Sequence, residues 1–240
     1  MTATSSPDSA FALDLTPHGT LAIEVVENGP IQTNTYFAIS GDEAVVIDPA
    51  WEGGKLAAHF AEAHPDARIV ALVCTHGHSD HTGGLAGMRD ALGEQVPFII
   101  SADDAALVDQ HIVWFRENWG IETEQPPAPD RLLAEGDTIA FGDVRMQVIA
   151  TPGHTPGGIV LFCATEEGDV AFCGDTLFPG SHGRTDLPGG SETTIMHSLA
   201  HLFRLLPEDT ICLCGHGPST TVAAELENNP FVRRALSTGY

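Results

Sequence analysis

The most informative segment of the sequence is residues 75–81, which read Thr75-His76-Gly77-His78-Ser79-Asp80-His81. Four of these seven side chains are imidazoles or a carboxylate that can bind a divalent metal. The apolar, β-branched run at residues 68–74 directly before them predicts a buried strand. The four groups are therefore expected at a strand end, with His76 and His78 on one side of a tight turn. The adjacent pair Asp80 and His81 faces another way, as a second metal would require.

Three more candidate metal ligands lie far along the chain, each just past a predicted strand. They are His154, Asp175 and His216, and a glycine comes directly before each of them. Glycine permits a sharp turn and a close approach of the backbone, which a crowded metal site needs. The pattern predicts that the three side chains join the first four.

Hydrophobic periodicity and turn residues give the order of the other elements. Strands are predicted at residues 20–27, 35–40, 44–48, 68–74, 97–101, 137–141, 144–150, 158–163, 169–173 and 210–214. Helices are predicted at residues 54–63, 84–92, 102–109, 193–206 and 220–228. Residues 122–130 carry three prolines and are predicted to form a loop, either a lid or a connection. Strands followed by helices, twice over, indicate two sheets packed face to face with helices outside.

Length and composition favour one soluble domain. The 240 residues are 42% hydrophobic, and we expect an N-terminal tail at residues 1–18 and a single domain at residues 19–240. Ten Lys and Arg against 33 Asp and Glu give a net charge of −23, which disfavours nucleic acid and anionic membrane surfaces as partners. We expect a small-molecule substrate and a monomer or homodimer.

The expected location is the cytoplasm. The first residues show no basic stretch followed by an apolar core, and no window approaches 18 uncharged apolar residues. The five cysteines are odd in number and lie in or beside strand-like runs, which suits reduced, buried thiols rather than a disulfide framework.

The ordered motifs resemble those of the metallo-β-lactamase superfamily, in its glyoxalase II-like (hydroxyacylglutathione hydrolase) branch. The matching motifs are residues 75–81, Gly153-His154-Thr155, Gly174-Asp175-Thr176-Leu177-Phe178 and Gly215-His216-Gly217-Pro218. The chain is similar to the short, single-domain members, because it stops soon after Phe231. The resemblance implies an α/β fold, a four-layer αβ/βα sandwich of two mixed β-sheets with the site at one edge, in agreement with the predicted element order.

The resemblance also implies a ligand set for two divalent metal ions. The first metal would be held by His76, His78 and His154, the second by Asp80, His81 and His216, and Asp175 would bridge both. The imidazole-rich first site suits zinc, and iron or manganese also fit the carboxylate-rich second site. Two ions about 3.5–4 Å apart can share a water whose pKa falls from about 15.7 toward 7, which predicts hydrolysis. Asp80 could also orient that water or accept its proton.

In the glyoxalase II-like branch the substrate is a thioester such as S-D-lactoylglutathione. Residues 181–186 resemble the substrate loop of that branch, with Arg184 as the expected anchor for a carboxylate and His182 as a second expected contact. An equally open interpretation is that Arg184 pairs with Asp186 and holds the loop.

Other functions on the same fold stay open. A persulfide dioxygenase would use a single iron at the three-histidine site, and a lactone or β-lactam hydrolase would use the same machinery. A nuclease would need a basic face or an additional RNA-binding domain, and neither is visible in the sequence.

Two further features bear on the site. Asp48, which ends a predicted strand, is expected to support residues 75–81 through hydrogen bonds. Trp114, Phe115 and Trp119 could wall a pocket, although aromatic residues at helical spacing are more often part of a core.

Overall fold

A computed structural model describes residues 11–238 and residue 240. The first ten residues of the expected tail therefore lie outside the described residues. The rest of that tail packs on the domain, because Phe11 and Leu13 contact the core beneath the C-terminal helices. The Gln147 side chain also exchanges two hydrogen bonds of 2.7 Å with the backbone of Asp14.

The first half of the chain forms one six-stranded mixed sheet. Its strands, in spatial order, are β1 (Ala22–Asn28), β2 (Thr33–Ser40), β3 (Glu43–Ile47), β4 (Arg68–Val73), β5 (Phe98–Ser101) and β6 (Arg131–Leu133). The strands β1 to β3 pair antiparallel, and β3 to β6 pair parallel. The parallel strands are nearly continuous apolar runs, as expected for strands covered on both faces.

The second half forms a second six-stranded mixed sheet. Its strands, in spatial order, are β14 (Thr220–Thr221), β13 (Ile211–Cys214), β10 (Gly168–Gly174), β9 (Ile159–Thr165), β8 (Val144–Ala150) and β7 (Thr138–Phe141). Only β10 and β13 pair in parallel. A small hairpin of β11 (Leu177–Phe178) and β12 (Ser181–His182) follows β10.

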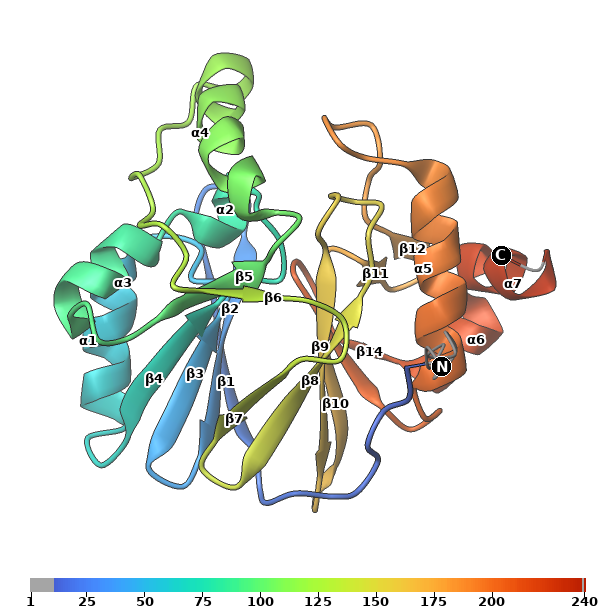
Figure 1. Cartoon of the computed structure of the whole chain (residues 1–240), viewed down its shortest axis with the longest axis horizontal. Helices are drawn as coiled ribbons and strands as arrows, with labels where there is room; N and C mark the ends of the chain where they lie inside the picture. Colours follow the sequence, from blue (N-terminus) through green and yellow to red (C-terminus); the bar gives the residue numbers. More distant parts are fainter. Residues whose placement is uncertain (1–10, 239) are drawn as a thin grey trace, which may run out of the picture.

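Helices cover the outer faces of both sheets and complete the four-layer αβ/βα sandwich (Figure 1). On the side of the first sheet lie α1 (Gly53–Ala63), α2 (Ser79–Thr82), α3 (Leu85–Leu92) and α4 (Ala105–Trp119). On the side of the second sheet lie α5 (Glu192–Leu205), α6 (Val222–Asn228) and α7 (Pro230–Ser237). The predicted fold class is confirmed.

Three apolar clusters correspond to the three interfaces between the four layers. The central cluster lies between the sheets, where the rings of Tyr36 on β2 and Phe172 on β10 meet edge to face with centroids 5.5 Å apart. The outer clusters pack α1 and α3 against the first sheet, and α5 and α7 against the second. Burial of these side chains is the main force that holds the layers together.

The predicted helix at residues 102–109 is wrong in extent, because α4 continues to Trp119. Its buried stripe consists of Leu107, Val108, His111 and Phe115, so a histidine occupies a position where the apolar period expects a hydrophobic residue. The helix ends at Gly120, whose φ of 68° is the usual left-handed termination.

The sequence also did not predict β6, α2, α7 or the hairpin of β11 and β12, most of which are very short. The predicted helix at residues 220–228 is wrong at its start, because Thr220–Thr221 forms β14 and α6 begins at Val222. Residues 122–130 contain no helix or strand and connect α4 to β6, as the prolines predicted. Within the described residues, none of the helices has both the length and the apolar character to cross a membrane.

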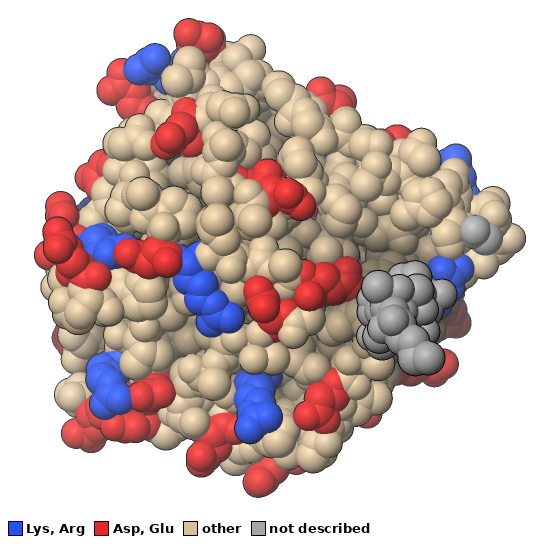
Figure 2. Space-filling model, viewed as in Figure 1, with Lys and Arg blue, Asp and Glu red and all other residues tan. Residues whose placement is uncertain are grey.

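Charge on the molecular surface is predominantly negative. On the face that Figure 2 shows, Lys and Arg side chains are scattered, and most of them lie next to Asp or Glu. The only lysine, Lys55, pairs with Glu52, and Arg68 pairs with both Asp42 and Glu43. The cations on this face therefore do not merge into a basic area.

Candidate metal centre

Seven histidine and aspartate side chains meet where strands of both sheets end. His76 and His78 follow β4, and Asp80 and His81 belong to the single turn of α2. The other three follow strands of the second sheet: His154 comes after β8, Asp175 after β10, and His216 after β13. Strand ends that share one edge of a sandwich bring residues distant in sequence together, as the sequence predicted.

The seven side chains form three overlapping groups that could hold metal ions. Within each group the ligand atoms lie within 4.8 Å of one another. The groups are His76 with His78 and His154; His76 with His81 and Asp175; and Asp80 with His81 and His216. The first and third groups contain the histidines and Asp80 in the division between two metals that the family resemblance implied, and the expected bridging residue, Asp175, belongs to the second group.

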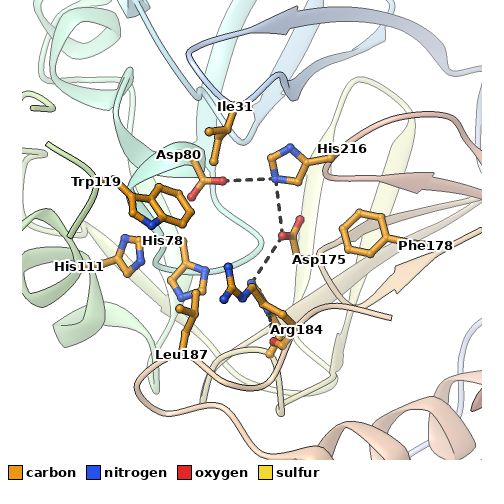
Figure 3. A pocket seen from close by; sticks show the side chains of 11 residues that line it. Ile31, His78, Asp80, His111, Trp119, Asp175, Phe178, Arg184, Leu187 and His216 are labelled. Carbon is orange, nitrogen blue, oxygen red and sulfur yellow. Dashed lines mark hydrogen bonds and ion pairs between the residues drawn. The ribbon is translucent and has the colours of Figure 1, made fainter. Parts of the chain in front are cut away.

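Asp175 lies between the first and third groups. Its Oδ1 atom is 3.4 Å from Nε2 of His81, and its Oδ2 atom is 3.5 Å from Nε2 of His154. Oδ2 is also 3.6 Å from Nε2 of His216 (Figure 3). Oδ2 therefore lies near one histidine of each group, and Oδ1 near another histidine of the third group, which is a suitable position for a bridging ligand.

Several buried nitrogen and oxygen atoms of the cluster have no hydrogen-bond partner in the part of the chain that the structure describes, a pattern that is typical of metal ligands. The Nε2 atoms of His76, His78 and His154 and Oδ1 of Asp175 are buried and make no hydrogen bond within the described residues. A buried polar atom without a hydrogen-bond partner destabilises the fold by about 1–3 kcal/mol. Because several such atoms point to one place here, a single partner that all of them bind would remove this cost. Imidazole nitrogens and carboxylate oxygens are suitable ligands for zinc, iron or manganese, and the cluster fits such ions.

Hydrogen bonds on the far side of the rings orient the histidines. Nδ1 of His81 is 2.9 Å from Oδ2 of Asp48, and Nδ1 of His154 is 2.7 Å from the backbone oxygen of Arg184. Nδ1 of His216 lies 3.2 Å from the backbone oxygen of Gln32. With Nδ1 held by these acceptors, Nε2 of each ring is turned to the cluster, as in many metal sites.

Asp48 ties the loop after β4 to the centre. Its Oδ1 accepts a 2.7 Å hydrogen bond from the backbone N–H of Thr75, and its Oδ2 accepts one of 2.7 Å from the Thr75 hydroxyl. Together with its contact to His81, the Asp48 carboxylate thus binds the backbone N–H of Thr75, the Thr75 hydroxyl and Nδ1 of His81. The predicted supporting role of Asp48 is confirmed.

The electrostatics divide the histidines of the cluster. Burial would lower the pKa of His81, but the carboxylates of Asp80, Asp175 and Asp48 outweigh it and raise this pKa well above the ordinary value. Burial likewise acts against the charged form of His216, and Asp80 and Asp175 raise its pKa.

Burial and the neighbouring imidazoles hold the pKa of His76 and His78 well below the ordinary value, so both rings are neutral. Burial would raise the pKa of Asp80, but His81 and the hydrogen bond from His216 outweigh it and lower the pKa to about 2. Burial likewise acts against ionisation of Asp175, and the surrounding histidines lower its pKa further still.

Gly215 shows how closely the backbone approaches the cluster. A Cβ atom at this position would lie 2.2 Å from Oδ1 of Asp175 and 2.7 Å from Cε1 of His81. Only glycine fits there, which explains why glycine precedes His216 in the sequence.

A cavity of about 300 Å³ opens above the cluster. Figure 3 shows the side chains around it, with Asp175, His216 and Phe178 on one side, Trp119 and His111 on the other, and Asp80 between Trp119 and His216. The apolar lining residues come from four different segments of the chain. They are Ile31, Trp119, Phe178 and Leu187. Trp119 therefore walls the pocket, whereas Phe115 is part of the core.

The two predicted substrate residues are placed differently. Arg184 lines the cavity, and it also pairs with Asp186 through two hydrogen bonds of 2.7 Å, so both interpretations of this residue have a structural basis. His182 does not line the cavity. Its ring packs edge to face on Phe231 of α7, with centroids 4.4 Å apart, and its predicted substrate contact gains no support from this position.

Sequence reasoning missed two residues beside the cluster. Asp104 accepts hydrogen bonds from the backbone N–H groups of Gly77 (2.8 Å) and Gly157 (2.6 Å), and so joins the ligand loops of the two halves. His111 of α4 lines the cavity, and burial lowers its pKa to about 4. The sequence does contain a clue to His111, because it is a polar residue in the buried stripe of an amphipathic helix. Recognising that stripe would have required predicting the full extent of α4.

An αβ/βα sandwich with this cluster at the edge of its two sheets is the architecture of a metal-binding hydrolase. The chain belongs to the metallo-β-lactamase superfamily, whose family model matches residues 28–216. The probable metallo-hydrolase YqgX of Bacillus subtilis is 35% identical over 205 residues, which cover 85% of this chain and 94% of that protein. Hydroxyacylglutathione hydrolase GloC of Haemophilus influenzae is 30% identical over 212 residues, which cover 88% and 97%.

Solved structures show the same fold. BLEG-1 B3 metallo-β-lactamase superposes with a TM-score of 0.79 at 31% identity, covering 88% of this chain and 99% of that one. TTHA1623, in a di-iron-bound form, gives 0.77 at 38% identity, covering 87% and 99%. ETHE1 from Myxococcus xanthus gives 0.71 at 26% identity, covering 90% and 88%. The family and the cluster together indicate divalent metal ions.

Proposed function

We propose that the protein is a metal-dependent hydrolase of a thioester such as S-D-lactoylglutathione, with a hydroxy acid and a free thiol as products. The observation that carries the proposal is the pair of complete neighbouring ligand groups with Asp175 between them. The substrate class is supported by the similarity to GloC, whose name is that of a hydroxyacylglutathione hydrolase. The proposed partner is thus a small molecule.

The proposed ligands divide between two metal positions. His76, His78 and His154 would hold the first ion, and Asp80, His81 and His216 the second, with Asp175 shared between them. Zinc is the proposed metal because imidazoles dominate, and iron or manganese would also be accepted by these ligands. When bound, divalent ions would polarise a carbonyl oxygen and make water nucleophilic at neutral pH.

Asp80 is the proposed catalytic acceptor. Its carboxylate lines the cavity and is ionised at neutral pH, because its pKa is about 2. An ionised oxygen at the cavity floor can accept a hydrogen bond from the attacking water and orient it toward the acyl carbon. Nε2 of His216, 3.3 Å from Oδ2 of Asp80, limits the positions that the carboxylate can take.

The remaining walls would bind the parts of the substrate that do not react. Ile31, Trp119 and Phe178 offer apolar surface that excludes water from the reacting bond. Arg184 would anchor a carboxylate of the thiol carrier. Two of its nitrogens bind Asp186, while Nη1 makes no hydrogen bond within the described residues and remains available to a ligand.

The test combines metal analysis with turnover. We expect two equivalents of metal in the purified protein and release of thiol from S-D-lactoylglutathione at the same rate with and without dissolved oxygen. One iron, uptake of oxygen with glutathione persulfide and no thiol release would instead identify a persulfide dioxygenase. The completeness of the group of Asp80, His81 and His216 favours the hydrolase, because a mononuclear enzyme has no need of it.

A second candidate is hydrolysis of a β-lactam or lactone ring. It is favoured by the similarity to BLEG-1, whose name is that of a B3 metallo-β-lactamase. The same protein preparation should be offered a chromogenic cephalosporin and a homoserine lactone. A kcat/KM for either one that exceeds the value for S-D-lactoylglutathione would replace the thioesterase proposal.

A further inference from the structure

His111 is a buried histidine of the cavity wall that belongs to none of the three ligand groups. It is 4% exposed, and its ring lies against the ring of His78 with centroids 4.2 Å apart. The indole of Trp114 stacks on it, with centroids 5.1 Å apart and an interplanar angle of 25°. In Figure 3 the ring lies beside Trp119 and His78, at the edge of the cavity.

Hydrogen bonding fixes which nitrogen of His111 carries the proton. The backbone N–H of Ser79 donates to Nδ1 at 2.9 Å, and the Ser79 hydroxyl lies 3.1 Å from the same atom. A nitrogen that accepts a hydrogen bond from a backbone N–H cannot itself be protonated. The proton of the ring is therefore on Nε2, which makes Nε2 a hydrogen-bond donor.

That donor has no acceptor among the residues that the structure describes. Nε2 of His111 is buried and makes no hydrogen bond within the described part of the chain. A buried donor without an acceptor is rare in native proteins, because nothing replaces the hydrogen bond that the donor would make to water. Since Nδ1 is turned to Ser79 and the ring faces lie against His78 and Trp114, Nε2 is the atom left for a ligand in the cavity.

A thioester substrate bound in the cavity would bring oxygen acceptors close to Nε2 of His111. We infer that Nε2–H of His111 donates a hydrogen bond to an oxygen of the acyl group of the substrate, an inference that rests on the thioester hydrolase proposed above. The acyl group is the part of the substrate that reacts above the cluster, and His111 adjoins His78 of that cluster. Arg184, a second donor of the cavity wall, binds Asp186 through two of its nitrogens, and its remaining nitrogen is assigned above to a carboxylate of the thiol carrier.

Two substitutions separate this role from simple support of Ser79. In His111→Asn, the side-chain oxygen takes the place of Nδ1 and can still accept from Ser79, but nothing replaces Nε2–H. In His111→Gln, the amide nitrogen reaches the place of Nε2 and can donate, while the bond to Ser79 is lost. We expect kcat/KM for S-D-lactoylglutathione to fall about 10-fold in the Asn variant and less in the Gln variant. Both variants should keep the metal content of the wild type.

A larger loss of kcat/KM in His111→Gln than in His111→Asn would overturn the inference. If the Asn variant keeps wild-type activity, or if it loses metal, the role of His111 is to hold Ser79 and the ligand loop. Circular dichroism of both variants establishes that each is folded.

Two glutathione thioesters that differ only in the acyl group show which oxygen of the substrate accepts the hydrogen bond from His111. S-D-lactoylglutathione carries a 2-hydroxyl, and S-propionylglutathione lacks it. A loss in the Asn variant with both substrates assigns the bond to the carbonyl oxygen, and a loss with the lactoyl compound alone assigns it to the hydroxyl. If the wild type hydrolyses neither compound, the proposed function fails and the inference falls with it. If the wild type is active and the Asn variant equals it on both, only the inference about His111 is overturned.

Discussion

At the scale of single residues, the centre depends on side chains that hold its ligands as much as on the ligands themselves. The Asp48 carboxylate binds both the ring of His81 and the backbone of Thr75. We expect Asp48→Asn to lower metal affinity by about 10- to 100-fold, because an amide N–H facing Nδ1 of His81 would favour the wrong tautomer. Competition with a chromogenic chelator measures this affinity.

Asp42→Asn is the matched control for that prediction. Asp42 lies in the turn between β2 and β3 of the same sheet, its side chain is 72% exposed, and within the described chain it pairs only with Arg68. Its substitution should leave metal affinity unchanged. Equal losses in the two variants would attribute the effect to net charge rather than to the orientation of His81.

Asp175 is the residue whose loss should damage the site most. It contacts histidines of both ligand groups, so Asp175→Ala removes the bridge and leaves those imidazoles facing one another without a shared carboxylate. We expect metal content to fall and kcat/KM to fall more than about 100-fold, beyond the loss typical of a supporting residue. Elemental analysis together with steady-state kinetics checks both parts, and full metal occupancy would contradict the bridging role.

Arg184 should behave differently. Its guanidinium is half exposed and lies at the cavity wall rather than at the cluster. We expect Arg184→Ala to raise KM about 5-fold, to change kcat little and to leave metal content intact, since a solvent-exposed ion pair contributes about 1 kcal/mol or less. A fall in kcat with KM unchanged would instead show that Arg184 acts in the transition state.

At the scale of elements, the ends of the strands determine what the site can tolerate. Gly215 follows β13, and a methyl group there would meet Asp175 at 2.2 Å. We expect Gly215→Ala to reduce metal binding more than 10-fold, because a displacement of about 1 Å is enough to spoil coordination. Isothermal titration with zinc into the metal-free protein measures the change.

Gly180→Ala is the control for Gly215→Ala. Gly180 lies in the turn of the hairpin with φ of 69°, and apart from its chain neighbours no described residue has a heavy atom within 4 Å of where a Cβ would lie. The substitution therefore strains only the backbone, and zinc binding should persist. Loss of binding in both variants would indicate a general loss of fold.

The ligands were predictable because each follows a strong local signal. An apolar strand, a glycine and a polar group recur at His154, Asp175 and His216, and the family pattern assigns them to one centre. The contacts that cross between elements left no such signal. Asp104 joins two ligand loops only because α4 begins beside them, and the position of His182 follows from the packing of α7, a helix that was not predicted.

At the scale of the whole molecule, the centre connects the two halves of the sandwich. Four of its ligands belong to the first half of the chain and three to the second. Metal binding should therefore stabilise the complete fold, by about 4 kcal/mol when free metal is at 1,000 times Kd. The prediction is a higher urea midpoint for the metal-loaded protein than for the chelated protein.

The Asp175→Ala variant provides the control for metal-linked stability. Because it lacks the group that contacts both ligand sets, its urea midpoint should change much less on addition of metal. Identical midpoints for loaded and chelated wild-type protein would contradict a coupling between metal binding and folding.

The division of the chain into one sheet per half has a consequence for its synthesis on the ribosome. The first sheet is complete once β6 has been made, at Leu133, yet its inner face carries Tyr36, Val45 and Val73 of the central cluster. That apolar face stays uncovered until the strands of the second sheet emerge from the exit tunnel. A nascent chain paused in the interval exposes a half-core to solvent, and such intermediates are the usual clients of chaperones.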